Sequence, residues 1–249
     1  MLLTRLKSET RAIHQKLHEV VDLHCLQDSL STYQSSLLAY LQAIAPLEQV
    51  ASRILAGQHS SDGSANLRLP ATDFDKRLLK SSWLIGDLQH FGWDATELAN
   101  WFATPEHADQ RPFPSSLIQE FASQHLDAQQ IDIQQLIATT GNYPAELTAV
   151  DRSTFTGICY VCEGMTLGSS RIYPLVASAH QLSEQKGARF FYAYGDAETA
   201  QQHWQQFRDW VDQQSLEEDR VVSAAVETFR WFETVLSNWK TSKPSVRHA

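Results

Sequence analysis

Cysteine, glycine and proline are all scarce in this chain of 249 residues, with 3, 10 and 8 copies respectively. The cysteines are Cys25, Cys159 and Cys162, an odd number at wide spacing that does not indicate a framework of disulfides. This pattern favours a reducing compartment, and we therefore expect a cytoplasmic protein. The few glycines and prolines cluster between long helix-like segments, which favours an all-α fold.

Long apolar runs and positive charge are lacking as well. No run approaches the ~20 apolar residues that a membrane-spanning helix needs. Met1-Leu2-Leu3 is followed by charged residues and not by the apolar region of a signal peptide. The formal net charge of −9 disfavours nucleic acid or an anionic membrane surface as the principal partner. We expect neither a membrane nor a nucleic acid among the partners.

Several common catalytic motifs are absent from the sequence. It has no P-loop, no dinucleotide-binding fingerprint, no G-x-S-x-G elbow and no H-E-x-x-H zinc motif. Cys159 and Cys162 have the spacing of a redox motif, but they fall inside a predicted helix and not at a helix N-terminus that would lower a thiol pKa. Glu163 follows them where a c-type haem attachment needs histidine. We interpret both cysteines as buried helix residues.

The hydrophobic periodicity predicts a series of helices in one domain. Pro46 is expected to kink or split the second helix, and Gly92 to end the third as a C-terminal cap. Read alone, the aromatic run 188–194 permits a short strand. We expect the domain to span residues 1–239, followed by a disordered tail at 240–249. The predicted helices are Leu3–Leu23, Ser31–Ala56, Phe74–Phe91, Thr96–Phe102, Ser115–His125, Asp132–Thr139, Asp151–His180, Glu198–Gln213 and Leu216–Trp239.

The predicted helix Asp151–His180 contains three glycines in its interior. Gly157, Gly164 and Gly168 are spaced by seven and four residues, and at ~100° per residue they fall on nearly one side of the helix. Each costs roughly 0.5–1 kcal/mol relative to alanine. A face with three glycines predicts a close neighbour, either another helix or a flat ligand. Glu163, next to them, could act as an acid/base group, but we expect it to serve as a cap or to lie at the surface.

The first predicted helix carries a cluster of basic side chains. His14 falls at the edge of the apolar stripe of this helix, where an imidazole can point into a pocket and not into bulk water. Lys7 and Arg11 lie close to the same face. One interpretation is a solvated face that these residues form with His18 beside a core stripe. The other is a histidine ligand of haem iron, flanked by cations that pair with the haem carboxylates.

These patterns resemble the haem oxygenase family, and within it the bacterial, phytochrome-associated branch. Residues 6–14 (Leu-Lys-Ser-Glu-Thr-Arg-Ala-Ile-His) are similar to the N-terminal helix of that family, in which the haem-ligating histidine follows a threonine by four positions. Residues 160–169 (Tyr-Val-Cys-Glu-Gly-Met-Thr-Leu-Gly-Ser) are similar to its distal helix. Residues 104–140 show the least correspondence. Other similar positions are 83–88 with Gly92, 187–195 with Trp204 and Phe207, and 224–229.

The resemblance implies an all-α, haem oxygenase-like helical bundle, in which residues 188–195 form a loop or the start of a helix. It also implies the reaction of that family, the O₂- and electron-dependent opening of haem to biliverdin with release of CO and ferrous iron. Haem is then both cofactor and substrate. An external ferredoxin- or flavodoxin-type reductant would supply the electrons, and a phytochrome that accepts biliverdin is a candidate partner.

The same resemblance implies roles for individual residues. His14 would be the proximal ligand of haem iron through a neutral imidazole nitrogen. Gly164 and Gly168 would let the backbone of the distal helix lie against the haem face, with room for O₂ and for ordered waters that supply protons. Lys7 would meet a propionate. Weaker candidates for that contact are Arg11 and Arg208.

Two positions depart from the bacterial pattern. Met165 stands where relatives have serine, and it could fill space meant for water or donate a soft contact to the ring. Ser169 stands where relatives have a second glycine, and it either adds a hydroxyl near the distal face or hydrogen-bonds to its own helix. These departures leave open a non-enzymatic haem-binding or haem-sequestering protein on the same fold. A third interpretation is an enzyme of the thiaminase or quinone-cofactor type, which shares the scaffold but not the ligand.

Overall fold

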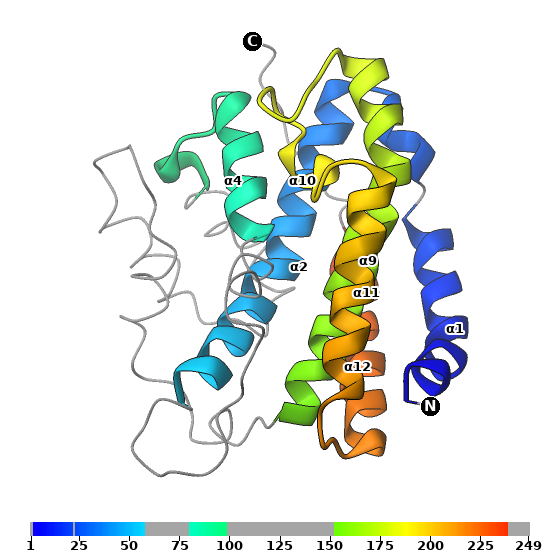
Figure 1. Ribbon diagram of the computed structural model, residues 1–249. Coiled ribbons are helices and arrows are strands. Elements are labelled where there is room, and N and C mark those ends of the chain that lie inside the picture. Colours follow the sequence, from blue (N-terminus) through cyan, green and yellow to red (C-terminus); the bar gives the residue numbers. More distant parts are fainter. Residues whose placement is uncertain (1, 22, 58–79, 99–151, 239–249) are drawn as a thin grey trace.

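The computed structural model describes residues 2–21, 23–57, 80–98 and 152–238 (Figure 1). Within these ranges the regular elements are helices, and bridges from Ser183 to Lys186 and to Gly187 are isolated contacts outside any strand. The all-α prediction is therefore confirmed. The elements are α1 (Leu2–Val20), the 3-10 helix η1 (Leu23–Gln27), α2 (Leu30–Gly57), α4 (Lys80–His90), α9 (Arg152–His180), α10 (Arg189–Tyr192), α11 (Ala197–Asp212) and α12 (Glu218–Asn238).

Most helix boundaries lie close to their predicted positions, and the differences have local causes. The strand alternative for 188–194 is wrong, because this segment forms the helical turn α10. Of the two effects expected at Pro46, a kink or a split, the split does not occur, since α2 continues through that residue. Gly92 has a φ of +86° directly after α4, which confirms it as the cap glycine. The predicted helices Ser115–His125 and Asp132–Thr139 and the tail 240–249 lie outside the described residues.

Helix α12 is the element against which the candidate site is built. It packs along α9 on one side and along α1 on another, and it also contacts α2. Helices α1 and α9, by contrast, make no extended contact with each other, as Figure 1 shows for the part of the chain that is described. Both helices run in the same direction as α12, because Arg5 pairs with Asp219 and Lys16 with Glu233, while the amide of Glu217 donates to Ser153.

The sequence of α12 explains its central place. Its apolar residues recur at steps of three and four, so two of its faces are buried against neighbours. The buried ones are Val221, Val222, Ala224, Ala225, Phe229, Phe232, Val235 and Leu236. Among the described helices, none combines the length and hydropathy required to cross a bilayer.

Candidate functional site

The three glycines of α9 have different neighbours, although they share a helix face. A Cβ at Gly157 would lie 2.5 Å from the carbonyl oxygen of Val221 and 2.7 Å from the Cβ of Ala224, so glycine lets α9 and α12 touch there. At Gly164 and Gly168 a Cβ would meet no atom of the described residues within 4 Å. Among the described residues, the glycine face of α9 is therefore tightly packed at Gly157, half-buried and open at Gly164, and exposed at Gly168.

A tyrosine on the glycine face connects α9 to α1. Burial raises the pKa of Tyr160, and a side-chain hydrogen bond with Thr10 of α1 partly offsets this rise. Thr10 is itself buried, and its hydroxyl donates to the carbonyl of Leu6 at 2.7 Å. One helical turn further in the same direction stand His14 on α1 and Gly164 on α9. The structure thus brings His14 and Gly164 to the same level of two neighbouring parallel helices, just above the contact between Thr10 and Tyr160.

His14 is solvent-accessible, but two rings cover part of it. The imidazole of His18 lies edge-on at 4.5 Å between ring centroids, and the ring of Phe229 on α12 lies at 5.5 Å. Partial burial lowers the pKa of His14, and the neighbouring His18 lowers it further. The imidazole is therefore held in its neutral form at neutral pH, which is the form that coordinates metal ions.

The predicted cationic partners are exposed and distributed over two helices. Lys7 and Arg11 are exposed on α1, as are His14 and His18, so the solvated-face interpretation fits these four side chains as well as the ligand interpretation does. Arg208 is exposed on α11, where its guanidinium donates to Gln205 at 3.4 Å. Helix α11 packs on α9 and not along α1, so no described contact joins Arg208 to His14. The roles of these cations stay predictions.

The two departures from the bacterial pattern lie within α9 but differ in their surroundings. Ser169 is buried, and its hydroxyl donates to the carbonyl of Met165 at 3.1 Å, as the back-bonding alternative predicts. Met165 is partly buried and packs against the hydrophobic core. On the helix it stands ~100° from Gly164, so it borders the glycine face without lying at its centre.

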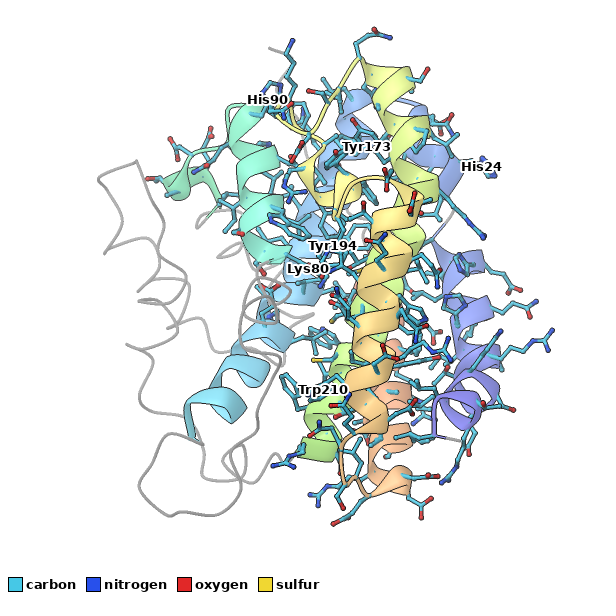
Figure 2. All side chains as sticks on the ribbon, viewed as in Figure 1. His24, Lys80, His90, Tyr173, Tyr194 and Trp210 are labelled. Carbon is cyan, nitrogen blue, oxygen red and sulfur yellow. The ribbon has the colours of Figure 1, made fainter. Side chains whose placement is uncertain are left out.

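Glu163 is where the sequence interpretation is wrong. This residue is 4 % exposed and lies in a buried polar cluster, not at the surface. Its Oε1 accepts a hydrogen bond from the ammonium of Lys80 at 3.1 Å and from the hydroxyl of Tyr194 at 3.0 Å. Figure 2 shows Lys80 and Tyr194 close together in the interior, between α4 and α9. Nothing in the local pattern marks this cluster, because its members come from three separate parts of the chain.

Two further titratable groups lie in this cluster, and burial raises the pKa of each. Glu48 of α2 accepts hydrogen bonds from the backbone amides of Lys80 and Ser81, which begin α4. Burial raises the pKa of Glu48 to about 7, although these hydrogen bonds and the charge of Lys80 oppose the shift. The thiol of Cys162 is buried beside them, and burial raises its pKa to about 12. The prediction that Cys159 and Cys162 are buried helix residues is confirmed.

Comparison with known proteins finds a similarity to a family of haem-degrading enzymes. The family model described as Heme oxygenase matches residues 115–238, just under half of the chain. That part of the chain is therefore similar to the haem oxygenase family, and the described helices form an all-α bundle consistent with its fold. No curated protein and no solved structure matched the chain. The matched range contains Gly164, Gly168 and Arg208, whereas His14 and Lys7 precede it.

The residues that the structure brings together are compatible with haem. A single neutral imidazole suffices as the protein's ligand to haem iron, and partial burial lowers the pKa of His14, which favours that neutral form. Gly164 is half-buried at the level of this imidazole, Gly168 is exposed one turn beyond it, and a Cβ at either position would meet no described atom within 4 Å. A flat, largely apolar ring system needs such a side-chain-free wall.

Proposed function

We propose that the protein is a haem oxygenase that converts haem to biliverdin, CO and ferrous iron with O₂ and externally supplied electrons. The family match supports a haem-degrading oxygenase in general terms. Haem, when bound, supplies both the iron that activates O₂ and the macrocycle that is opened. A ferredoxin- or flavodoxin-type protein is the proposed electron donor, and a biliverdin-accepting phytochrome is a proposed recipient of the product.

His14 is the proposed ligand of haem iron. Its lowered pKa leaves a nitrogen lone pair available at neutral pH, so that binding needs no prior loss of a proton. The rings of His18 and Phe229 both lie edge-on to the imidazole, at 4.5 and 5.5 Å between centroids. We propose that Lys7 meets a haem propionate, with Arg11 and Arg208 as further candidates for that contact.

Gly164 and Gly168 form the proposed opposite wall. Without a Cβ at these positions, α9 leaves room for O₂ and for water molecules that carry protons. The contact between Thr10 and Tyr160 closes the site one turn below. Because burial raises the pKa of Tyr160, its hydroxyl keeps its proton and remains a hydrogen-bond donor throughout the neutral pH range.

The observation that carries this proposal is the common level of His14 and Gly164 above a contact that joins their helices. Titration of the purified protein with hemin tests it directly. We expect the Soret band of a histidine-ligated complex, and loss of that ligation in His14→Ala. His18→Ala tests the neighbouring imidazole as the alternative ligand, and this variant should keep the ligation although it removes the ring that lies against His14. Equal spectra for wild type and His14→Ala would refute the assignment.

Single-turnover spectra with a reductant distinguish oxygenase from haem-binding protein. A biliverdin absorption band in red light supports the oxygenase, whereas stable ferrous haem supports a sequestering protein. The side chain of Ser169 gives the oxygenase only partial support. It is buried, and its hydroxyl donates to the carbonyl of Met165, so this hydroxyl is not available on the glycine face to relay protons. Failure to bind hemin at all would favour the enzymes that share only the scaffold.

A further inference from the structure

The glycine segment of α9 is continuous helix, but it contains residues of types that weaken a helix. Gly164 and Gly168 leave the backbone freer than an ordinary helix would. Between and beside them, the hydroxyls of Thr166 and Ser169 donate to carbonyls one turn earlier, at 2.8 and 3.1 Å. Back-bonding of this kind slightly destabilises a helix and often bends it. The shape of this segment therefore depends on contacts that α9 makes with other elements.

Buried polar contacts from other elements converge on Glu163, the residue directly before Gly164. Its carboxylate is bound by the Lys80 ammonium and by the Tyr194 hydroxyl through the same oxygen atom. The side chains of Lys80 and Glu163 are only 2 % and 3 % exposed. Removing one partner from a buried charge pair leaves the other charge uncompensated, so such a pair resists separation far more than an exposed one does.

The two partners of Glu163 are themselves fixed by other helices. The backbone amide of Lys80 donates to Glu48 of α2 at 2.5 Å. The ring of Tyr194 stacks on His203 of α11 at 4.1 Å and meets Trp83 of α4 edge-on at 5.9 Å. Through these contacts the Glu163 carboxylate is tied to α2, α4 and α11, and the backbone of α9 is held at that point.

We propose that Lys80, Glu163 and Tyr194 form a clamp that fixes the glycine segment 164–168 and thereby sets the width of the space beside it. Glu163 stands ~100° from Gly164 around the helix, so the clamp acts through the backbone and not by touching a ligand. Its three members are positioning residues. The consequence for haem rests on the function proposed above, whereas the fixing of the segment does not.

Amide hydrogen exchange of the haem-free protein tests the clamp. Tyr194→Phe and Glu163→Gln each weaken it with little change in volume. Tyr33→Phe is the matched control, because Tyr33 is also buried and its hydroxyl also donates one hydrogen bond, to the carbonyl of Gly187 at 2.9 Å. We expect the amides of residues 164–168 to exchange about tenfold faster or more in both clamp variants. In Tyr33→Phe they should exchange at the wild-type rate.

The hemin complex gives a second measurement, the ratio of high-spin to low-spin bands well below the Tm of each variant. We expect this ratio to change in both clamp variants and to stay unchanged in Tyr33→Phe. Unchanged exchange at 164–168 in Tyr194→Phe would overturn the clamp, even if Glu163→Gln fails to fold. If the amides of residues 164–168 exchange faster but the ratio of high-spin to low-spin bands stays unchanged, the proposed effect of the clamp on the haem site is wrong. A wild type that binds no hemin would refute the proposed function and leave the clamp standing.

Discussion

Replacing glycine by alanine should have opposite effects at two positions on the same face of α9. At Gly157 the new methyl group would lie 2.5 Å from the backbone oxygen of Val221 and 2.9 Å from the backbone nitrogen of Ala225, neither of which can move without shifting α12. Overpacking of this kind costs about 1–3 kcal/mol, more than the roughly 0.5–1 kcal/mol that alanine adds to helix stability. At Gly164 no described atom opposes the methyl group, so only the gain remains.

Thermal unfolding of the haem-free variants measures the difference. For a chain of this size, 1 kcal/mol corresponds to about 2–4 °C in Tm. We expect Gly157→Ala to lower the Tm by several degrees and Gly164→Ala to raise it by about 1–4 °C. Gly86→Ala in α4 is the matched control, since Gly86 is exposed, helical and without a neighbour within 4 Å. It should raise the Tm as much as Gly164→Ala does.

Hemin binding then separates stability from function. Gly164→Ala should weaken hemin binding or turnover while it stabilises the protein, because the methyl group occupies the proposed wall of the site. Gly86→Ala should leave both unchanged. If Gly157→Ala and Gly164→Ala shift the Tm in the same direction, the difference in packing between these two positions is wrong. If Gly164→Ala binds hemin as the wild type does, Gly164 is not part of the wall.

Three further predictions concern the buried polar cluster and its surroundings. Burial raises the pKa of Glu48 to about 7 from an ordinary value of 4.5, so the folded protein retains a proton that the unfolded chain has released, and stability should fall as the pH rises through this interval. Urea midpoints at pH 5 and pH 8 measure this fall, and Glu48→Gln should reduce it; an equal fall in both proteins would contradict the assignment. Lys80→Met should cost about 3–5 kcal/mol in urea unfolding, because it leaves Glu163 as a buried uncompensated charge. Most of that loss should be recovered when Glu163→Leu is added, and a double variant no more stable than the single one would count against the ion pair. A water-soluble thiol reagent at pH 8 should label Cys25, which is partly exposed, well before Cys162, whose thiol is buried with a pKa of about 12; equally fast labelling of both would show that α9 opens readily.

The sequence predicts those features of the fold that depend on local patterns. The bounds of α9 follow from helical periodicity, and the end of α4 follows from Gly92, whose positive φ few other residues adopt as easily. Pro46 shows the limit of such reasoning. Proline removes one helical hydrogen bond, but α2 continues through it, and this helix packs against η1, α4, α9 and α12.

The candidate site is predicted less completely, because part of it depends on contacts between distant residues. Helical spacing places Gly157 and Gly164 on one face, but it cannot show that a neighbouring helix touches the first and leaves the second open. Glu163 is predicted at the surface because charged residues are seldom buried without a partner. Its partners Lys80 and Tyr194 lie 83 and 31 positions away, and only the tertiary structure reveals them.

The dependence of both walls of the proposed site on α12 has a consequence for the order of assembly. Helix α1 is fixed against α12 by contacts such as that between Arg5 and Asp219, which are 214 positions apart. Closing so long a loop is slow, and during synthesis it must wait until the last of these helices has been made. A nascent chain in which α1 and His14 have already left the ribosome therefore still lacks α12, the helix that sets the distance from α1 to α9. The ability to capture haem should accordingly arise late and abruptly in folding, when α12 docks.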